Sequence, residues 1–236
     1  ANYSGDANNN LAASACNAAN ESVNVVLLTS QRLYAANSGG TNISAYAIGA
    51  DGTLVAIAGS PFAAGTNPVA VALTPDGQYL YAANINSNNI SAYSVGAGGS
   101  LTPVSGSPFG TGGNPQAVAV SPNGAYLYVA SADGVSAYSI AADGQLSAIG
   151  LPVTAGTDTL GLAVTPDGKH LYATNFISHD VSAFSIAADG GLTEITDSPF
   201  AAGTNARFVT VTPDGTHLYV ANQGSDDVSA FSIDAI

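Results

Sequence analysis

A five-fold repeat limits the possible folds of this chain more than any other feature of its sequence. Leu-Tyr, followed by two small or β-branched residues and then Asn or Ser, recurs every 44 to 47 residues. A second aromatic residue, in Ser-Ala-Tyr or Ser-Ala-Phe, lies twelve residues after the first in four repeats and ten after it in the third. The two series are Tyr34, Tyr81, Tyr128, Tyr172 and Tyr219, and Tyr46, Tyr93, Tyr138, Phe184 and Phe231. A fixed period of this length indicates that one small structural unit is repeated around a ring or along a stack.

The pattern within each repeat predicts four short strands. An inner strand, such as residues 69–73, precedes a Pro-Asp-Gly or Pro-Asn-Gly turn, in which proline fixes φ and glycine supplies a positive φ. The Leu-Tyr segment is the second strand, residues 43–48 and their equivalents are the third, and the fourth ends in Ser-Pro-Phe. Four-stranded units at this period are typical of a β-propeller. We therefore predict an all-β propeller of five four-stranded blades over residues 23–236, whereas a stacked solenoid usually has shorter repeats.

The last repeat is one strand short, because only five residues follow Phe231. At the other end of the chain, Asn9-Asn10-Leu11 resembles Gly52-Thr53-Leu54, which leads into a fourth strand. We therefore expect residues 1–22 to be a separate segment that supplies the strand closing the ring. That strand is donated either within the chain or to a neighbouring subunit.

The charge of the chain excludes several kinds of partner. Charged residues make up 8% of the sequence, the net charge is -13, and the only strong bases are Arg32, Lys169 and Arg207. Nucleic acids and anionic membrane surfaces need clustered Lys and Arg, so neither is an expected partner. No apolar run approaches the ~18 residues of a membrane span, so membrane insertion is not expected. Low charge and few tryptic sites favour a secreted or cell-surface protein.

Two segments carry a resemblance to a known family. Residues 218–231, Leu-Tyr-Val-Ala-Asn-Gln-Gly-Ser-Asp-Asp-Val-Ser-Ala-Phe, look like the YVTN propeller repeat. The linker 59–68, followed by Val-Ala-Val and Thr-Pro-Asp-Gly, is similar to bacterial lactonase-like propellers of the 6-phosphogluconolactonase type. The resemblance implies a propeller fold and allows hydrolysis of a sugar lactone. Members of that family usually carry seven blades, whereas five repeats are present here.

The candidate site residues lie in loops expected on one face of the propeller. His179, beside Asp180, is the best candidate for chemistry. Arg207 is expected near the mouth of the channel, where it either binds an anion or another ligand or simply donates a hydrogen bond to loop carbonyls. Phe176, among neutral amides, favours carbohydrate as a ligand, although asparagine also simply supports turns. The pair Asp226-Asp227 lacks the spacing of a calcium loop, and no cofactor motif is present, so we expect neither metal nor cofactor. Four Asn-x-Ser sequences are candidate glycosylation sites: Asn2, Asn20, Asn42 and Asn89.

The shortage of ionisable residues decides the functional prediction. Lactone hydrolysis needs groups for proton transfer, and few are available here. We therefore predict a non-enzymatic, extracellular structural or interaction module that could also assemble with itself into a filament or lattice by strand exchange. The alternatives are a lactonase-like hydrolase of a sugar lactone and a carbohydrate-binding propeller.

Overall fold

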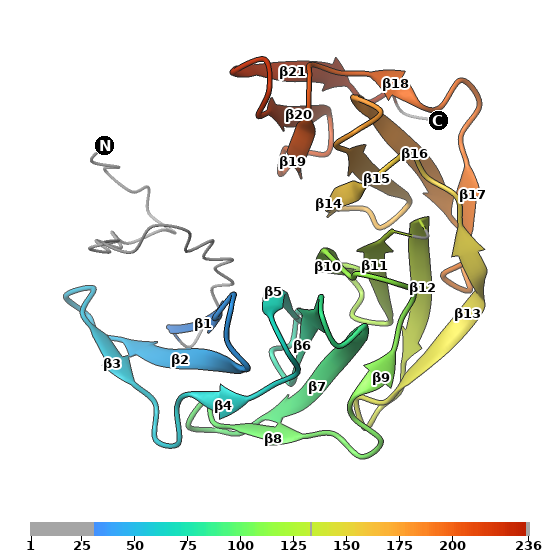
Figure 1. The fold of residues 1–236 in the computed structure, drawn as a ribbon. Coiled ribbons are helices and arrows are strands. Elements are labelled where there is room, and N and C mark those ends of the chain that lie inside the picture. The colour runs from blue at the N-terminus through green and yellow to red at the C-terminus, as the bar shows by residue number, and fades with distance from the viewer. Residues whose placement is uncertain (1–30, 133, 235–236) are drawn as a thin grey trace.

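The computed structural model describes residues 31–132 and 134–234, which form strands, turns and loops. The strands make five antiparallel sheets that follow one another around an arc, and the inner strands of the last four sheets contact one another in turn (Figure 1). The first sheet contains β1 (Arg32–Ala36), β2 (Asn42–Ile48), β3 (Leu54–Ala56) and β4 (Phe62–Ala63). The second contains β5 (Pro68–Leu73), β6 (Tyr79–Asn84), β7 (Asn89–Val95), β8 (Leu101–Pro103) and β9 (Phe109–Gly110).

The remaining three sheets follow the same order along the chain. The third contains β10 (Ala117–Val120), β11 (Tyr126–Ser131), β12 (Gly134–Ile140) and β13 (Leu146–Val153). The fourth contains β14 (Thr159–Val164), β15 (His170–Asn175), β16 (Asp180–Ile186), β17 (Leu192–Glu194) and β18 (Phe200–Ala201). The fifth contains β19 (Ala206–Val211), β20 (His217–Asn222) and β21 (Asp227–Ser232). The all-β, propeller-type architecture predicted from the repeat is confirmed. The closing segment, residues 1–22, and the inner strand expected before β1 lie outside the described residues.

The fourth strand of the repeat is split into two pieces in three of the sheets. In the first sheet, β3 and β4 both pair with β2, one after the other. Between the two pieces, the hydroxyl of Ser60 accepts a hydrogen bond from the N–H of Ala45 at 2.9 Å. Ser107 and Ser198 do the same in the second and fourth sheets. The serine of Ser-Pro-Phe therefore continues the ladder where the backbone of the outer strand leaves it.

Each hairpin turn after an inner strand is fixed by its own side chains. The hydroxyl of Thr74 donates to Oδ1 of Asp76 at 2.6 Å and accepts from the N–H of Tyr79 at 3.0 Å. The same carboxylate oxygen accepts from the N–H of Gln78 at 3.0 Å. Equivalent bonds form in the turns that contain Asn123, Asp167 and Asp214. The Pro-Asp-Gly turns predicted from the sequence are confirmed.

The core consists of four interfaces between neighbouring sheets. One face of each of the first four sheets carries the tyrosine of the second strand and a β-branched residue of the third, and all of these are buried: Tyr34, Ile43, Tyr81, Ile90, Tyr128, Val135, Tyr172 and Val181. Three of the tyrosine hydroxyls donate across the interface to a glycine carbonyl of the next sheet. The pairs are Tyr34 with Gly99, Tyr81 with Gly144, and Tyr128 with Gly190, at 2.8, 3.0 and 3.2 Å. A polar tip that reaches a partner makes tyrosine well suited to this position.

The fifth sheet carries the same face, but its side chains are exposed. Tyr219 is 40% exposed, Val228 is 63% exposed and Phe208 is 60% exposed. This sheet lies at one end of the arc in Figure 1, and the first sheet lies at the other end. No sheet among the described residues packs on this face. In the same part of the chain, no helix is long and apolar enough to cross a membrane.

Candidate functional site

The loops after the second strands and the linkers between sheets are joined by backbone hydrogen bonds. Ile85 donates to the carbonyl of Asn67 at 3.0 Å, and Phe176 donates to that of Asp158 at 2.9 Å. Asn67, Asn114, Asp158 and Asn205 occupy the same linker position and have φ between 53° and 61°. This left-handed conformation is one that asparagine and aspartate tolerate better than most residues. The linkers and loops therefore form one connected face, as the sequence predicts.

Asp180 and Asp227 are held by the loops in which they lie. Oδ1 of Asp180 accepts from Nδ2 of Asn175 at 2.6 Å, and Oδ1 of Asp227 accepts from Nδ2 of Asn222 at 2.7 Å. Donation from Asn222, and then from Ser225, holds the pKa of Asp227 below its usual value. These contacts fix the loop geometry.

Asparagine occupies the same position in the first two sheets. Asn42 accepts from Asn37 at 2.6 Å, and Asn89 accepts from Asn84 at 2.8 Å. The loop contact therefore needs a side-chain oxygen but no charge. Glycosylation of Asn42 and Asn89 stays a prediction, and Asn2 and Asn20 lie outside the described residues.

His179 also takes part in a loop contact. Its φ is 60°, and its Nδ1 accepts from the N–H of Asn205 at 2.9 Å. The carbonyl oxygen of Phe176 lies 3.0 Å from the same nitrogen and accepts from Nδ2 of Asn205 at 3.1 Å. An Nδ1 that accepts a hydrogen bond carries no proton, so we assign the proton of the neutral ring to Nε2 from the Asn205 contact. His179 can then donate a hydrogen bond to a ligand, but in this form it is no general base.

Arg207 lies at an irregularity in the inner strand. The pairing of β19 with β20 shifts register between Ala206 and Phe208, so Arg207 is the extra residue. Extra residues of this kind re-aim side chains at sheet edges and next to binding sites. Its Nη1 donates to Oε1 of Gln223 at 2.7 Å, and its guanidinium carbon lies 5.4 Å from the centre of the Phe208 ring. Gln223, which the sequence analysis missed, is thus the partner that orients Arg207.

The backbone of Arg207 is held by the fourth sheet. Its carbonyl oxygen accepts from the hydroxyl of Thr174 at 2.8 Å. A Cβ at Gly161 would lie 2.6 Å from that carbonyl oxygen and 2.6 Å from the Thr174 hydroxyl. This close approach therefore requires glycine at position 161. It fixes the position of the Arg207 backbone relative to the fourth sheet.

Among the described residues, no carboxylate pairs with the charge of Arg207. In the described part of the chain the one ion pair joins Lys169 to Asp167 at 3.9 Å. Arg32 donates to the carbonyls of Gly96 and Ala97 instead. No hydrogen bond or ion pair between described residues joins Arg207 to His179, Asp180, Asp226 or Asp227. The structure therefore joins Phe176 and His179 through Asn205, and no described contact joins Arg207 to them.

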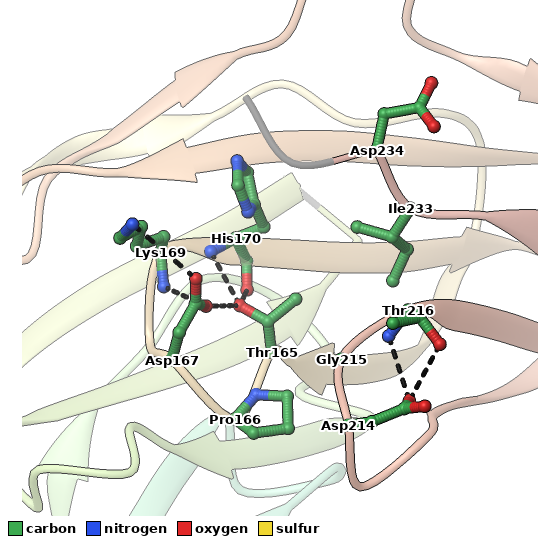
Figure 2. Close-up of a pocket in the computed structure, with 10 residues that line it drawn as sticks. All are labelled: Thr165, Pro166, Asp167, Lys169, His170, Asp214, Gly215, Thr216, Ile233 and Asp234. Atoms are coloured by element: carbon green, nitrogen blue, oxygen red, sulfur yellow. Dashed lines mark hydrogen bonds and ion pairs between the residues drawn. The ribbon is translucent and has the colours of Figure 1, made fainter.

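Two cavities lie between the fourth and fifth sheets, the larger of them at the hairpin turns. The larger, of about 490 Å³, is lined by the two turns and by Ile233 and Asp234 (Figure 2). In the turns Asp167 and Asp214 accept from their own threonines, as Figure 2 shows for the bonds of Asp214 to Thr216. The smaller, of about 210 Å³, adjoins Tyr172, Phe200 and Phe231.

These cavities occupy a place that is filled in the other interfaces. There, the residue before Leu-Tyr reaches the turn after the third strand of the next sheet: Tyr79 donates to the carbonyl of Ala142 and Tyr126 to that of Ala188. His170 holds this position beside the cavities. We therefore assign them to the three-stranded fifth sheet and not to a substrate. No group of three metal-ligating side chains is found in residues 31–132 and 134–234.

The sequence matches the family described as lactonase, 7-bladed beta-propeller, in three overlapping segments, residues 9–108, 96–198 and 161–236. The chain belongs to this lactonase family. No curated protein matches the sequence. The chain is similar to solved structures of proteins assigned as 6-phosphogluconolactonases from Bacteroides uniformis (22% identity, TM-score 0.75) and Bacteroides fragilis (24%, 0.76), covering 88% of this chain and 65% of each of theirs.

A third similar structure is the periplasmic gluconolactonase of Pseudomonas aeruginosa. It has 23% identity and a TM-score of 0.72, and the match covers 86% of this chain and 63% of that one. This lactonase-family chain therefore spans less than two thirds of the length of these structures. At such identities the likeness establishes the fold.

The prediction of a non-enzymatic structural and self-assembling module is wrong. The family that the chain matches is one of lactonases, and the three similar structures described above are named as lactonases. The error came from counting ionisable residues over the whole chain. A site needs only a few such groups, which a count over the whole chain cannot detect.

Proposed function

We propose that this chain takes part in the hydrolysis of a sugar lactone. The observation that carries the proposal is the lactonase family match, which runs from residue 9 to residue 236. In this reaction the oxygen of water bonds to the carbonyl carbon and the ring C–O bond breaks. The ring oxygen takes up a proton to become a hydroxyl, and the new carboxylic acid releases its proton to water at neutral pH.

Arg207 is the residue best placed to hold the substrate. Its guanidinium has several N–H donors, of which Gln223 takes one, and no carboxylate neutralises its charge among the described residues. Charge-assisted hydrogen bonds to oxygen are stronger than neutral ones, so the free donors favour an acidic group or a carbonyl oxygen of the substrate. The Nε2–H of His179 is a second donor on the same face.

Acid release measured in a pH-stat tests this proposal. The protein is assayed against a panel of sugar lactones, with spontaneous hydrolysis subtracted. We expect turnover that falls at least ~10-fold in Arg207→Ala, the loss that one charge-assisted hydrogen bond of about 1.4 kcal/mol predicts. Lys169→Ala, which removes a base on the opposite face, is the control and retains full activity. Folded protein that releases no acid from any lactone contradicts the proposal.

We also propose that the protein is exported from the cytoplasm. The scarcity of Lys and Arg supports this, and one similar structure is that of a periplasmic enzyme. Fractionation of the native host tests it, and recovery of the protein only from the cytosol would contradict it.

For the fold itself, we propose that five blades form a ring closed by residues 11–16 beside β21. In the described residues β21 pairs only with β20, whereas the equivalent strands pair on both edges. In the first and fourth sheets the last isoleucine of the third strand pairs with the first leucine of the fourth, as Ile48 with Leu54 and Ile186 with Leu192. The equivalent pair in the fifth sheet would be Ile233 with Leu11.

The native Cys16 offers a test of this closure. A cysteine introduced at Val228, which this register places opposite Cys16, should form a disulfide with Cys16 within one chain. A disulfide between chains would show that the strand comes from a neighbour, and the absence of any disulfide would contradict the closure.

A further inference from the structure

His179 joins two segments that are distant in sequence. It lies in the loop between β15 and β16, and its Nδ1 accepts the N–H of Asn205 in the linker that leads into β19. The carbonyl of His179 also accepts from the N–H of Ala202 at 3.0 Å. Two residues after Asn205 the chain reaches Arg207. The imidazole thus holds this loop against the linker that leads to Arg207. We call the hydrogen bond between His179 Nδ1 and the Asn205 N–H the clasp.

The second sheet has the same clasp with a different residue. Asn88 occupies the position of His179, with φ of 51°, and its Oδ1 accepts from the N–H of Asn114 at 2.8 Å. The carbonyl of Asn88 accepts from Thr111, just as that of His179 accepts from Ala202. An amide oxygen accepts hydrogen bonds at any pH, whereas a ring nitrogen accepts only when it is unprotonated. The repeat therefore contains one clasp that cannot titrate and one that can.

We propose that His179 is a pH-sensitive positioning residue for the linker that carries Arg207. In the neutral ring, Nδ1 accepts the Asn205 N–H. When a proton from water binds Nδ1, that nitrogen becomes a donor, and its nearest acceptor is the carbonyl oxygen of Phe176 at 3.0 Å. The imidazolium then donates to Phe176, and the N–H of Asn205 loses its acceptor. The two states use the same atoms with opposite roles, so protonation exchanges one contact for the other.

Few other charges surround this clasp. The linker that packs on the ring, residues 202–205, contains no ionisable side chain, and the next one along the chain is Arg207. On its own loop the neighbour is Asp180, whose Oδ1 already accepts from Asn175 and Ser178. On the following loop, between β20 and β21, the acids are Asp226 and Asp227. In the described part of the chain none of these acids lies within ion-pair distance of the ring. Histidine is the side chain whose charge ordinarily changes between pH 5 and pH 8, so these two pH values are the ones at which the clasp is compared.

Loss of the contact between His179 and Asn205 affects the linker and leaves the pairing of the sheets in place. The N–H of Gln223 still donates to the carbonyl of Asn205 at 3.0 Å, and the bond between Ala202 and the His179 carbonyl involves no titrating atom. The change is therefore confined to the Asn205 amide and the entry to β19. Its effect on Arg207 as a substrate anchor rests on the proposed function, whereas the clasp itself does not.

Amide hydrogen exchange measured by NMR tests the proposal without any assay of activity. Protection factors, corrected for intrinsic exchange, are compared at pH 8 and pH 5 for the amides of Asn205 and Asn114. We expect the protection of Asn205 to fall about 10-fold at pH 5, as expected for the loss of one hydrogen bond of about 1.4 kcal/mol, while that of Asn114 stays constant. Asn114 is an internal control, because Asn88 holds it in the same geometry.

The variant His179→Asn places the residue of the second sheet in the fourth. It should retain protection at Asn205 and remove its pH dependence, whereas His179→Ala should lose the protection at both pH values. Protection of Asn205 that follows Asn114 across the pH range in the wild type overturns the proposal. So does a pH dependence that persists in His179→Asn.

Discussion

The side-chain oxygen of Asn175 accepts a hydrogen bond from the hydroxyl of Thr159 at 2.9 Å, and both residues are buried. Asn222 occupies the same place in the fifth sheet, where it pairs with Ala206. Alanine has no hydroxyl, and the side-chain oxygen of Asn222 is buried without a partner among the described residues. A buried polar atom left unsatisfied costs about 1–3 kcal/mol.

The first prediction is that Ala206→Thr stabilises the protein. The added hydroxyl should reach Asn222 as Thr159 reaches Asn175, because the two pairs share one register. We expect a gain of about 1 kcal/mol, which for a chain of this size raises the melting temperature by about 2–4 °C. Thermal unfolding followed by circular dichroism measures it. Thr159→Ala is the matched control and should lower the melting temperature, and a decrease in Ala206→Thr would show that the site has no room for threonine.

The second prediction concerns acid stability. Hydrogen bonds from the hydroxyl of Thr212, and then from the backbone and hydroxyl of Thr216, lower the pKa of Asp214 to about 2. The pKa of Asp76 is lowered mainly by Thr74, and that of Asp167 mainly by Thr165. An unfolded aspartate has a pKa of about 3.9, so these turns stabilise the fold above about pH 4 and lose that contribution as the pH falls toward 2.

The hairpin turn of the third sheet provides the variant that tests this acid dependence. Its Asn123 makes the same contacts without a charge. Asp214→Asn should therefore lower the melting temperature at pH 7 by less than about 2 °C and flatten its fall between pH 4 and pH 2. Asn123→Asp should make that fall steeper. Identical pH profiles for the wild type and Asp214→Asn would contradict the assignment.

The third prediction concerns the close approach at Gly161. In Gly161→Ala the new methyl group meets the carbonyl of Arg207 and the hydroxyl of Thr174, so the two sheets must separate. Overpacking of this kind costs about 1–3 kcal/mol, measurable by urea unfolding. Adding Thr174→Ala removes one of the two clashes and should restore part of the loss. A double variant no more stable than Gly161→Ala would place the strain on the Arg207 carbonyl alone.

The repeat allowed much of the fold to be predicted from the sequence. The turns depend on local residues, Pro-Asp-Gly among them, and the Ser-Pro-Phe strands depend on an edge preference of proline, so both could be read without the structure. Aligning the repeats also places Asp180 on Asn89 and His179 on Asn88, a signal that these residues hold loops.

The position of Arg207 could not be predicted in the same way. It depends on one extra residue in β19 relative to β20, which is a property of strand pairing and leaves no local mark in the sequence. The link to Gln223, 16 residues away, follows from that register and was missed for the same reason. Loop contacts that recur in four of the five repeats are therefore easier to infer from the sequence than one that occurs once.

The last prediction is that the fold becomes unstable at alkaline pH because of its buried tyrosines. Burial raises the pKa of Tyr81 and Tyr128 well above the ordinary value of 10.0, and it also raises that of Tyr34. The folded state holds these hydroxyls neutral, whereas the tyrosines of the unfolded chain ionise near pH 10. Their contribution to the folding stability is therefore complete below pH 10 and falls as the pH rises further. As these buried tyrosines ionise above pH 10, the tyrosinate absorbance should therefore rise together with the loss of the circular dichroism signal.

Tyr128→Phe removes the hydrogen bond to Gly190 together with one ionisable group. It should therefore lower the stability at pH 7 and reduce the loss of stability above pH 10. Tyr79→Phe, at a half-buried position, is the control. Ionisation of all tyrosines before any loss of circular dichroism would show that the hydroxyls are open to solvent and that the sheet interfaces are looser than these contacts require.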